Sequence, residues 1–159
     1  RGIAYERAKR WDESEADLKQ SLKLKPNNPS VMNYLAYSWV DRGVNVEQGL
    51  DMLKQAVAAR PEDGYIVDSL GWAYYKLGKY EEAVKYLEQA IMLEPGLSAI
   101  NDHLGDAYWK VGRQNEARFQ WQHALTMKPE KEDEPKIRRK LEVGLEEVAS
   151  VPAPGKTSN

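Results

Sequence analysis

Side chains that commonly carry out catalysis or bind metals are sparse in this chain of 159 residues. It has no cysteine, which excludes disulfides, thiolate metal ligands and cysteine nucleophiles. The two histidines, His103 and His123, stand 20 positions apart on segments expected to form different helices, and no HExxH-like spacing joins them. We expect two partly buried or surface histidines and no metal site.

The other candidates for reaction chemistry lack the surroundings that such chemistry needs. Ser69 follows Asp68, but no G-x-S-x-G elbow surrounds it and no histidine stands where a base is required. No glycine-rich loop precedes a helix, so no phosphate cradle is expected. Asp68, Asp102 and Asp106 should share a face, but carboxylates on a solvated helix face are ordinary. The sequence therefore predicts a protein that is not an enzyme and needs no cofactor.

Composition favours a folded chain whose partners are proteins. Hydrophobic residues make up 42% and charged residues 30%, which provides enough apolar surface for a core. Lys and Arg number 23 against 25 Asp and Glu, so no basic excess favours nucleic-acid binding. No apolar run approaches the roughly 20 residues of a membrane span, so no membrane insertion is expected of this segment. Nine Tyr and five Trp against one Phe suit grooves and interfaces, where one end of the ring is buried and the other is wet.

The chain repeats itself with a period of 34 residues. The matching pairs are Leu70/Leu104, Gly71/Gly105, Tyr74/Tyr108, Gly78/Gly112, Ala83/Ala117, Ala90/Ala124 and Pro95/Pro129. An earlier copy matches at Gly49, Leu53, Ala56 and Pro61 and, one residue out of phase, at Leu35, Ala36, Trp39 and Gly43. Gly2 and Tyr5 extend the pattern to a still earlier copy.

Steric requirements explain this pattern. Each copy carries two stretches of helical apolar periodicity, which predicts two helices. Gly78 and Gly112 lie where the first helix must end in a tight turn that requires a positive φ. The small Gly and Ala positions fall where helices cross closely, and the recurring proline stops the second helix. One such hairpin cannot bury its own apolar face, so the copies must stack into a continuous core.

The pattern Leu70-Gly71-x-x-Tyr74, Gly78-x-Tyr80, Ala83-x-x-x-Leu87, Ala90 and Pro95 resembles the tetratricopeptide repeat (TPR) family. The resemblance covers residues 1 to about 131 and implies an all-α, right-handed α-solenoid of helix-turn-helix repeats. We predict a truncated repeat at 1–28 and complete repeats at 29–63, 64–97 and 98–131.

The complete copies are similar to the C-terminal repeats of longer proteobacterial multi-TPR proteins. The first copy lacks half of its first helix, which also indicates an excised C-terminal portion of a longer chain. Relatives of this kind include lipid-anchored envelope proteins that act as adaptors for processing proteases. The resemblance leaves the cytoplasm and the bacterial periplasm or envelope open as compartments, and it favours the envelope.

A further amphipathic helix is predicted at 133–149, with a disordered tail at 150–159. Asp133 or Glu134 can cap this helix, and Pro135 suits its first turn. Ile137, Leu141, Leu145 and Val148 form an apolar stripe, and charged residues that include Lys140 cover the rest. We interpret it as the capping helix that closes the solenoid; the alternative is an amphipathic helix that binds a partner.

In TPR proteins the first helices of successive repeats line a concave surface where ligands bind. Positions carried over from the family predict a partner-binding groove made of Asn33, Tyr37, Tyr65, Asp68, Trp72, Tyr75, Lys76, Asp102, Asp106, Trp109 and Lys110. Aromatic anchors beside carboxylates suit a peptide with basic or hydrogen-bonding side chains. The alternative is that some of these aromatic rings only pack between adjacent first helices.

The family's clamp for the C-terminal carboxylate of chaperones is absent, because its basic positions hold Asn33, Asp68 and Asp102 here. The sequence thus predicts a non-catalytic scaffold or adaptor that binds another protein or peptide segment. The alternative function is self-assembly, with homo-oligomers formed through uncapped repeat ends or the C-terminal helix.

Overall fold

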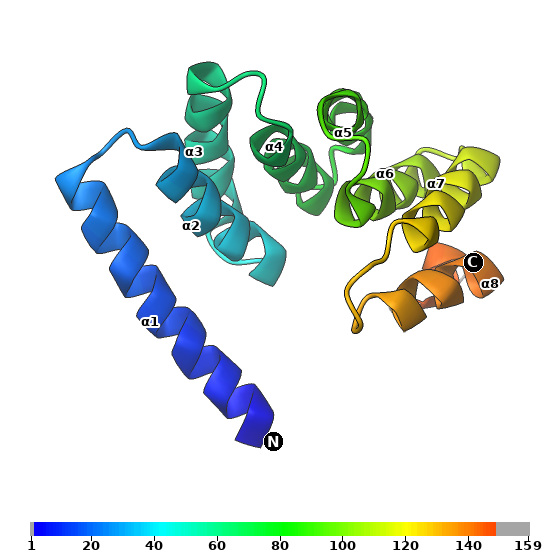
Figure 1. Cartoon of the computed structure of the whole chain (residues 1–159), viewed down its shortest axis with the longest axis horizontal. Coiled ribbons are helices and arrows are strands. Elements are labelled where there is room, and N and C mark those ends of the chain that lie inside the picture. The colour runs from blue at the N-terminus through cyan, green and yellow to red at the C-terminus, as the bar shows by residue number, and fades with distance from the viewer. Residues whose placement is uncertain (1, 149–159) are drawn as a thin grey trace, which may run out of the picture.

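The computed structural model describes the backbone of residues 2–148 and the side chains of residues 13–145. This part of the chain consists of eight α-helices and contains no strand. The helices are α1 (Gly2–Leu24), α2 (Pro29–Arg42), α3 (Val46–Ala59), α4 (Gly64–Lys76), α5 (Tyr80–Leu93), α6 (Ser98–Lys110), α7 (Gln114–Thr126) and α8 (Glu134–Val148). They follow an arc, with α2, α4, α6 and α8 towards its inner side (Figure 1). The predicted all-α solenoid is confirmed.

Three helical hairpins, α2–α3, α4–α5 and α6–α7, form the body of the arc. Their turns contain Gly43, Gly78 and Gly112, whose φ angles are 75°, 81° and 89°. A side chain is strained in this left-handed region, so glycine is the residue that lets each first helix end in a tight turn. The expectation for Gly78 and Gly112 is confirmed.

Small residues let the two helices of a hairpin approach closely. A Cβ atom added to Gly71 would lie 2.8 Å from Cγ of Leu87, and one added to Gly105 would lie 2.5 Å from the ring of Trp121. Ala83 and Ala117, on the facing helices, are completely buried. These positions therefore carry at most one methyl group, which lets the helices approach closely, as the repeat pattern predicts.

The first copy differs from the expected hairpin. The repeat pattern predicts a break between two helices near Lys9, which is aligned with Gly43, but α1 runs without interruption from Gly2 to Leu24. The physical reason is that position 9 is Lys where the later copies have glycine. Lysine is not suited to a positive φ, so the helix does not end in a tight turn there. Its second half packs beside α2, where Leu22 contacts the cluster around Met32.

Helix α8 packs against α6 and α7, in the position that the first helix of a further repeat would occupy. Ile137 and Leu145 are buried in the core of the last hairpin, and Leu141 is half-buried against it. The helix is interrupted at Gly144, where φ is 80° and ψ is 169°. The side chain of Val148 and the predicted tail at 150–159 lie outside the described residues.

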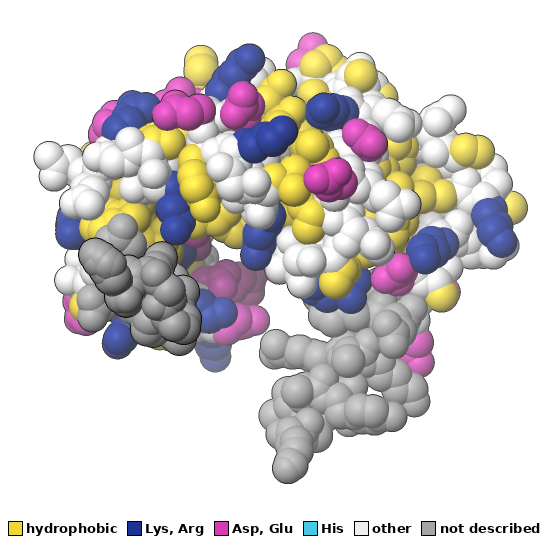
Figure 2. Space-filling view, turned by 180° about the vertical axis from the view of Figure 1, so that it is seen from behind, with side chains coloured by type: hydrophobic (Ala, Val, Ile, Leu, Met, Phe, Trp, Pro, Cys, Tyr) yellow, Lys and Arg dark blue, Asp and Glu magenta, His cyan; other side chains and the backbone are white. Residues whose placement is uncertain are grey.

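Seen from behind, the space-filling surface is hollowed between the two ends of the arc (Figure 2). Apolar side chains on the arc are interspersed with side chains of both charges (Figure 2). None of the helices over residues 2–148 combines the length and apolar character needed to cross a bilayer.

Candidate functional site

Carboxylates on the inner helices accept hydrogen bonds from the next inner helix along the arc. Asp41 of α2 accepts a bond from the indole N–H of Trp72 on α4 at 3.3 Å. Asp68 of α4 lies 2.9 Å from Nδ1 of His103 on α6. This pattern places much of the predicted acidic groove in contacts between repeats.

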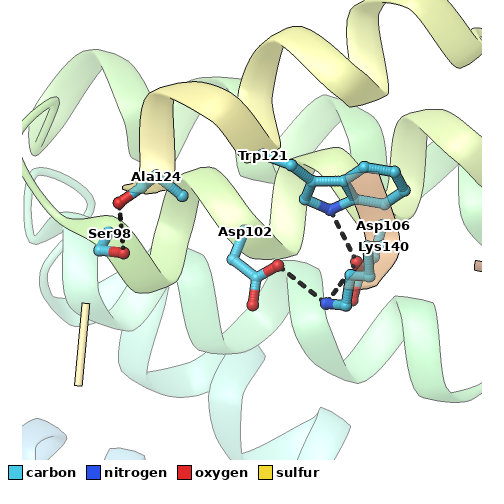
Figure 3. Close-up of polar contacts among 6 residues, drawn as sticks. All are labelled: Ser98, Asp102, Asp106, Trp121, Ala124 and Lys140. Atoms are coloured by element: carbon cyan, nitrogen blue, oxygen red, sulfur yellow. Dashed lines mark hydrogen bonds and ion pairs between the residues drawn. The ribbon is translucent and has the colours of Figure 1, made fainter. Parts of the chain in front are cut away.

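Helices α6 and α8 are joined in the same way through Lys140 (Figure 3). Nζ of Lys140 donates to Asp102 at 2.8 Å and to Asp106 at 2.9 Å, and the Lys140 side chain is 12% exposed. The indole N–H of Trp121, on α7, donates to Asp106 at 3.1 Å. Burial raises the pKa of Asp106 to about 6, although the charge of Lys140 acts to lower it.

Trp109 lies beneath the interruption in α8. A Cβ atom added to Gly144 would lie 2.5 Å from Cζ2 of Trp109, so only glycine lets the α8 backbone cover this ring. Trp109 is 8% exposed, and its ring centroid lies 5.6 Å from that of Trp121. Helix α8 therefore covers the C-terminal end of the predicted groove.

Trp72 is packed between two rings rather than presented to a ligand. Its centroid lies 4.0 Å from that of His103 and 4.5 Å from that of Tyr75, and both pairs are stacked. Burial acts to lower the pKa of His103, but the charge and hydrogen bond of Asp68 raise it overall. Trp72 and His103 thus fasten α4 to α6.

The N-terminal half of the inner face is more open. Tyr34 is 65% exposed and Tyr65 is 54% exposed, and no ring stacking involves either among the described residues. One turn further along α2, Tyr37 is half-buried. Burial and then the charges of four carboxylates raise the pKa of its hydroxyl; these are Asp41, Asp68, Asp133 and Asp102. This part of the inner face therefore has a negative field.

The predicted groove residues divide into three groups. Four are buried: Asp68, Trp72, Asp106 and Trp109. Four are half-buried: Asn33, Tyr37, Tyr75 and Asp102. Three are exposed: Tyr65, Lys76 and Lys110. The structure brings the buried and half-buried aromatic and acidic residues together mainly through contacts between helices.

Two expectations about charged side chains are wrong. Asp68 and Asp106 are buried rather than solvated, because each accepts a hydrogen bond from another helix. Lys140 does not belong to the solvated face of α8, since it is held by Asp102 and Asp106.

Three residues with clear roles were missed: Tyr34, Trp121 and Gly144. Trp121 had a signal, because the repeat period aligns it with Leu87 and Leu53, so an indole N–H enters a core position and requires an acceptor. Lys140, which the period aligns with Asp106 and Trp72, carried a similar signal for a place on the inner face. Among the described side chains, no group of three or more His, Asp or Glu is arranged to hold a metal ion.

Comparisons with known proteins agree with this architecture. Residues 67–97 and 99–131 each match a family model described as a tetratricopeptide repeat. The TPR repeat-containing protein PA4667 of Pseudomonas aeruginosa is 31% identical over 83 residues, which are 52% of this chain and 14% of that protein. The chain thus spans about one seventh of the length of this curated relative.

Solved structures are similar over most of the chain. A crystal structure of MamA is 21% identical with a TM-score of 0.69, covering 91% of this chain and 82% of that chain. MamA AMB-1 is 25% identical with a TM-score of 0.62, covering 79% and 74%. The second TPR domain of Spaghetti (RPAP3), solved with an HSP90 peptide, is 24% identical with a TM-score of 0.59, covering 69% and 99%.

The solenoid of helical hairpins, its glycine turns, its close helix crossings and the matching family models together define the class of protein. Residues 67–97 and 99–131 of the chain carry tetratricopeptide repeats. Proteins of this class are protein-interaction scaffolds and are typically not enzymes.

Proposed function

We propose that the chain is an adaptor that binds a segment of another protein on the inner face of the arc, mainly along α2 and α4. One observation carries this proposal: two large aromatic side chains, Tyr34 and Tyr65, are exposed beside a cavity of about 190 Å³ that both of them line. Exposed aromatic residues next to a cavity are typical anchors of protein interfaces.

The two ends of the inner face have different parts in this proposal. Helix α8 covers Trp109, and its Lys140 pairs with Asp102 and Asp106, so these residues maintain the solenoid. A partner segment therefore has its access at α2 and α4. The Spaghetti domain solved with an HSP90 peptide is a precedent for a peptide on this fold. Its ligand chemistry need not transfer, because Asn33, Asp68 and Asp102 offer no basic clamp for a terminal carboxylate.

Site-specific photo-crosslinking can test the proposal. We would place a photoreactive phenylalanine analogue at position 65 in one sample and at position 119 in another. Phe119 is the matched control, because it is 60% exposed but lies on α7. The substitution sites avoid Trp72 and Trp109, whose loss would remove packing between helices.

We expect a bacterial lysate to give a crosslinked partner from position 65 and not from position 119. Crosslinked products from position 119 alone would indicate that the partner binds the outer face. Products that join two copies of this chain would support the alternative, self-assembly.

A further inference from the structure

A small cavity between the first turns of α2 and α4 has no assigned role. Its volume is about 190 Å³, and it is lined by Ser30, Asn33, Tyr34, Asp63, Tyr65 and Ile66. The inference drawn from it rests on the proposed function and specifies which side chain of the bound segment this cavity receives.

The two aromatic walls of the cavity are available to a ligand. Tyr34 and Tyr65 are the most exposed of the described tyrosines, and within residues 13–145 neither ring contacts a cation or another ring. Trp72, on the same inner face, already has such partners: Lys76 lies over its ring, and Tyr75 stacks on the same ring. Unoccupied aromatic faces are attractive to a cationic group.

Two of the side chains that line the cavity, Asn33 and Asp63, carry acceptor oxygens. Oδ1 of Asn33 is buried and has no hydrogen-bond partner. Oδ1 of Asp63 accepts the backbone N–H bonds of Tyr65 and Ile66, which caps α4. Within the described part of the chain, no Lys or Arg pairs with the Asp63 carboxylate. A bound group that donates hydrogen bonds would satisfy Asn33 and use the remaining capacity of Asp63.

Charge around the cavity also favours a cation. An open hollow of about 650 Å³ shares Asp63 and Tyr65 with the cavity. The hollow adds two more carboxylates, Glu62 and Glu94, and one guanidinium, Arg60, whose Nη1 lies 3.5 Å from the Ser30 hydroxyl. Three carboxylates against one guanidinium leave the region negative, and the field at Tyr37, one turn away, has the same sign.

We propose that this cavity is the subsite for a lysine or arginine side chain of the bound segment. The cation lies between the rings of Tyr34 and Tyr65, and its N–H groups donate to Asn33 Oδ1 and to the Asp63 carboxylate. The flanking residues of the segment run along α2 and α4, where the remaining carboxylates favour further positive charge.

The test uses the full chain, labelled with ¹⁵N, in NMR titrations with four small probes. Nα-acetyl-arginine amide and Nα-acetyl-lysine amide carry the cation, whereas the citrulline and norleucine analogues keep a similar side-chain length without it. We expect the cationic probes to shift the signals of Asn33, Tyr34 and Tyr65 with a Kd at least fivefold lower than that of the neutral probes.

Two variants identify the residues responsible. Asp63→Asn removes the charge but retains a side chain that caps helices well, so we expect several-fold weaker binding of the cationic probes with the helix intact. The double variant Tyr34→Ala/Tyr65→Ala should abolish the shifts, whereas Phe119→Ala should leave them unchanged. Circular dichroism on each variant verifies the fold.

Equal shifts with citrulline and arginine probes, or binding that is unchanged in Asp63→Asn, would overturn the cation subsite. This failure is separate from that of the proposed function. A partner that still crosslinks from position 65 after Asp63→Asn, with undiminished yield, supports segment binding but contradicts the cation subsite. Cationic probes that bind while position 65 gives no crosslink would support the cation subsite but contradict segment binding.

Discussion

The two halves of the inner face present similar residue types in different states. In the C-terminal half, Asp102, Asp106 and Trp109 are engaged by α8 and by Trp121. In the N-terminal half, Tyr34 and Tyr65 are exposed beside a cavity. Aromatic and acidic side chains of the inner helices can therefore either join repeats or remain available to a partner.

We expect the largest effect on stability from a substitution at Lys140, which joins α8 to α6. Lys140→Met would leave the carboxylates of Asp102 and Asp106 close together without their cation. We expect a loss of about 3 kcal/mol in the free energy of unfolding, because breaking a buried ion pair by removing one partner leaves uncompensated buried charge. Urea denaturation followed by circular dichroism measures this loss.

Two controls accompany the Lys140 variant. Adding Asp102→Asn and Asp106→Asn to Lys140→Met should recover a large part of the stability, since no buried charge then remains. Arg138→Ala removes an exposed ion pair with Glu134 on the same helix and should cost at most about 0.5 kcal/mol. Equal effects of Lys140→Met and Arg138→Ala would mean that the Lys140 network is not buried in solution.

The contact between Gly144 and Trp109 gives the next largest effect. Gly144→Ala introduces a Cβ atom 2.5 Å from the indole and places alanine at a φ of 80°. We expect a loss of roughly 1–2 kcal/mol, as for other strained backbone positions. Gly96→Ala is the matched control, because a Cβ atom there meets nothing within 4 Å. If Gly144→Ala left the free energy of unfolding unchanged, α8 would not cover Trp109 as described.

The repeat architecture could be predicted from the sequence because its signals are steric and recur at a fixed period. Gly78, Gly71 and Pro95 each meet a local requirement for a turn, a close crossing or a helix end. Helix α1 shows the limit of this reasoning, since the period predicts a hairpin while the local residues favour one continuous helix.

The groove could be predicted only as a set of residue types on one side of the arc. Whether Asp68 faces solvent or His103 depends on a residue 35 positions away. One partner of Asp106, Lys140, is likewise on another helix, 34 positions away. The exposed Tyr34 lies one position after Asn33 and outside the positions that the family resemblance provides. Residue type therefore indicated aromatic and acidic character, but tertiary contacts decided which side chains remained accessible.

The pair of Asp68 and His103 predicts that stability depends on pH. Burial opposes the charged imidazole, but Asp68, and further away Asp102 and Asp106, raise the pKa of His103. A raised pKa means that the stabilisation is fully present below the unfolded-state value of about 6.5 and is lost as pH rises through the folded-state value. Burial raises the pKa of Asp106 to about 6, so its contribution also falls as pH rises, over a lower range.

Unfolding of the wild type and His103→Gln between about pH 5 and pH 8.5 tests this dependence. The wild type should lose stability with rising pH more steeply than the variant. The two stability curves should diverge at pH values at and above the unfolded-state pKa of histidine, about 6.5. Parallel curves for the two proteins would mean that the His103–Asp68 contact has no net preference for the charged imidazole.

The smallest effect on stability should come from the two tyrosines of the open half. Tyr34 and Tyr65 each expose more than half of their surface, so Tyr34→Ala/Tyr65→Ala removes little buried area. We expect the free energy of unfolding to change by at most about 0.5 kcal/mol per site, as for other surface substitutions. Phe119→Ala, on the outer helix α7, should behave similarly. A loss of unfolding free energy well above that of Phe119→Ala would mean that the tyrosines hold α2 against α4. The N-terminal half of the inner face would then resemble the C-terminal half.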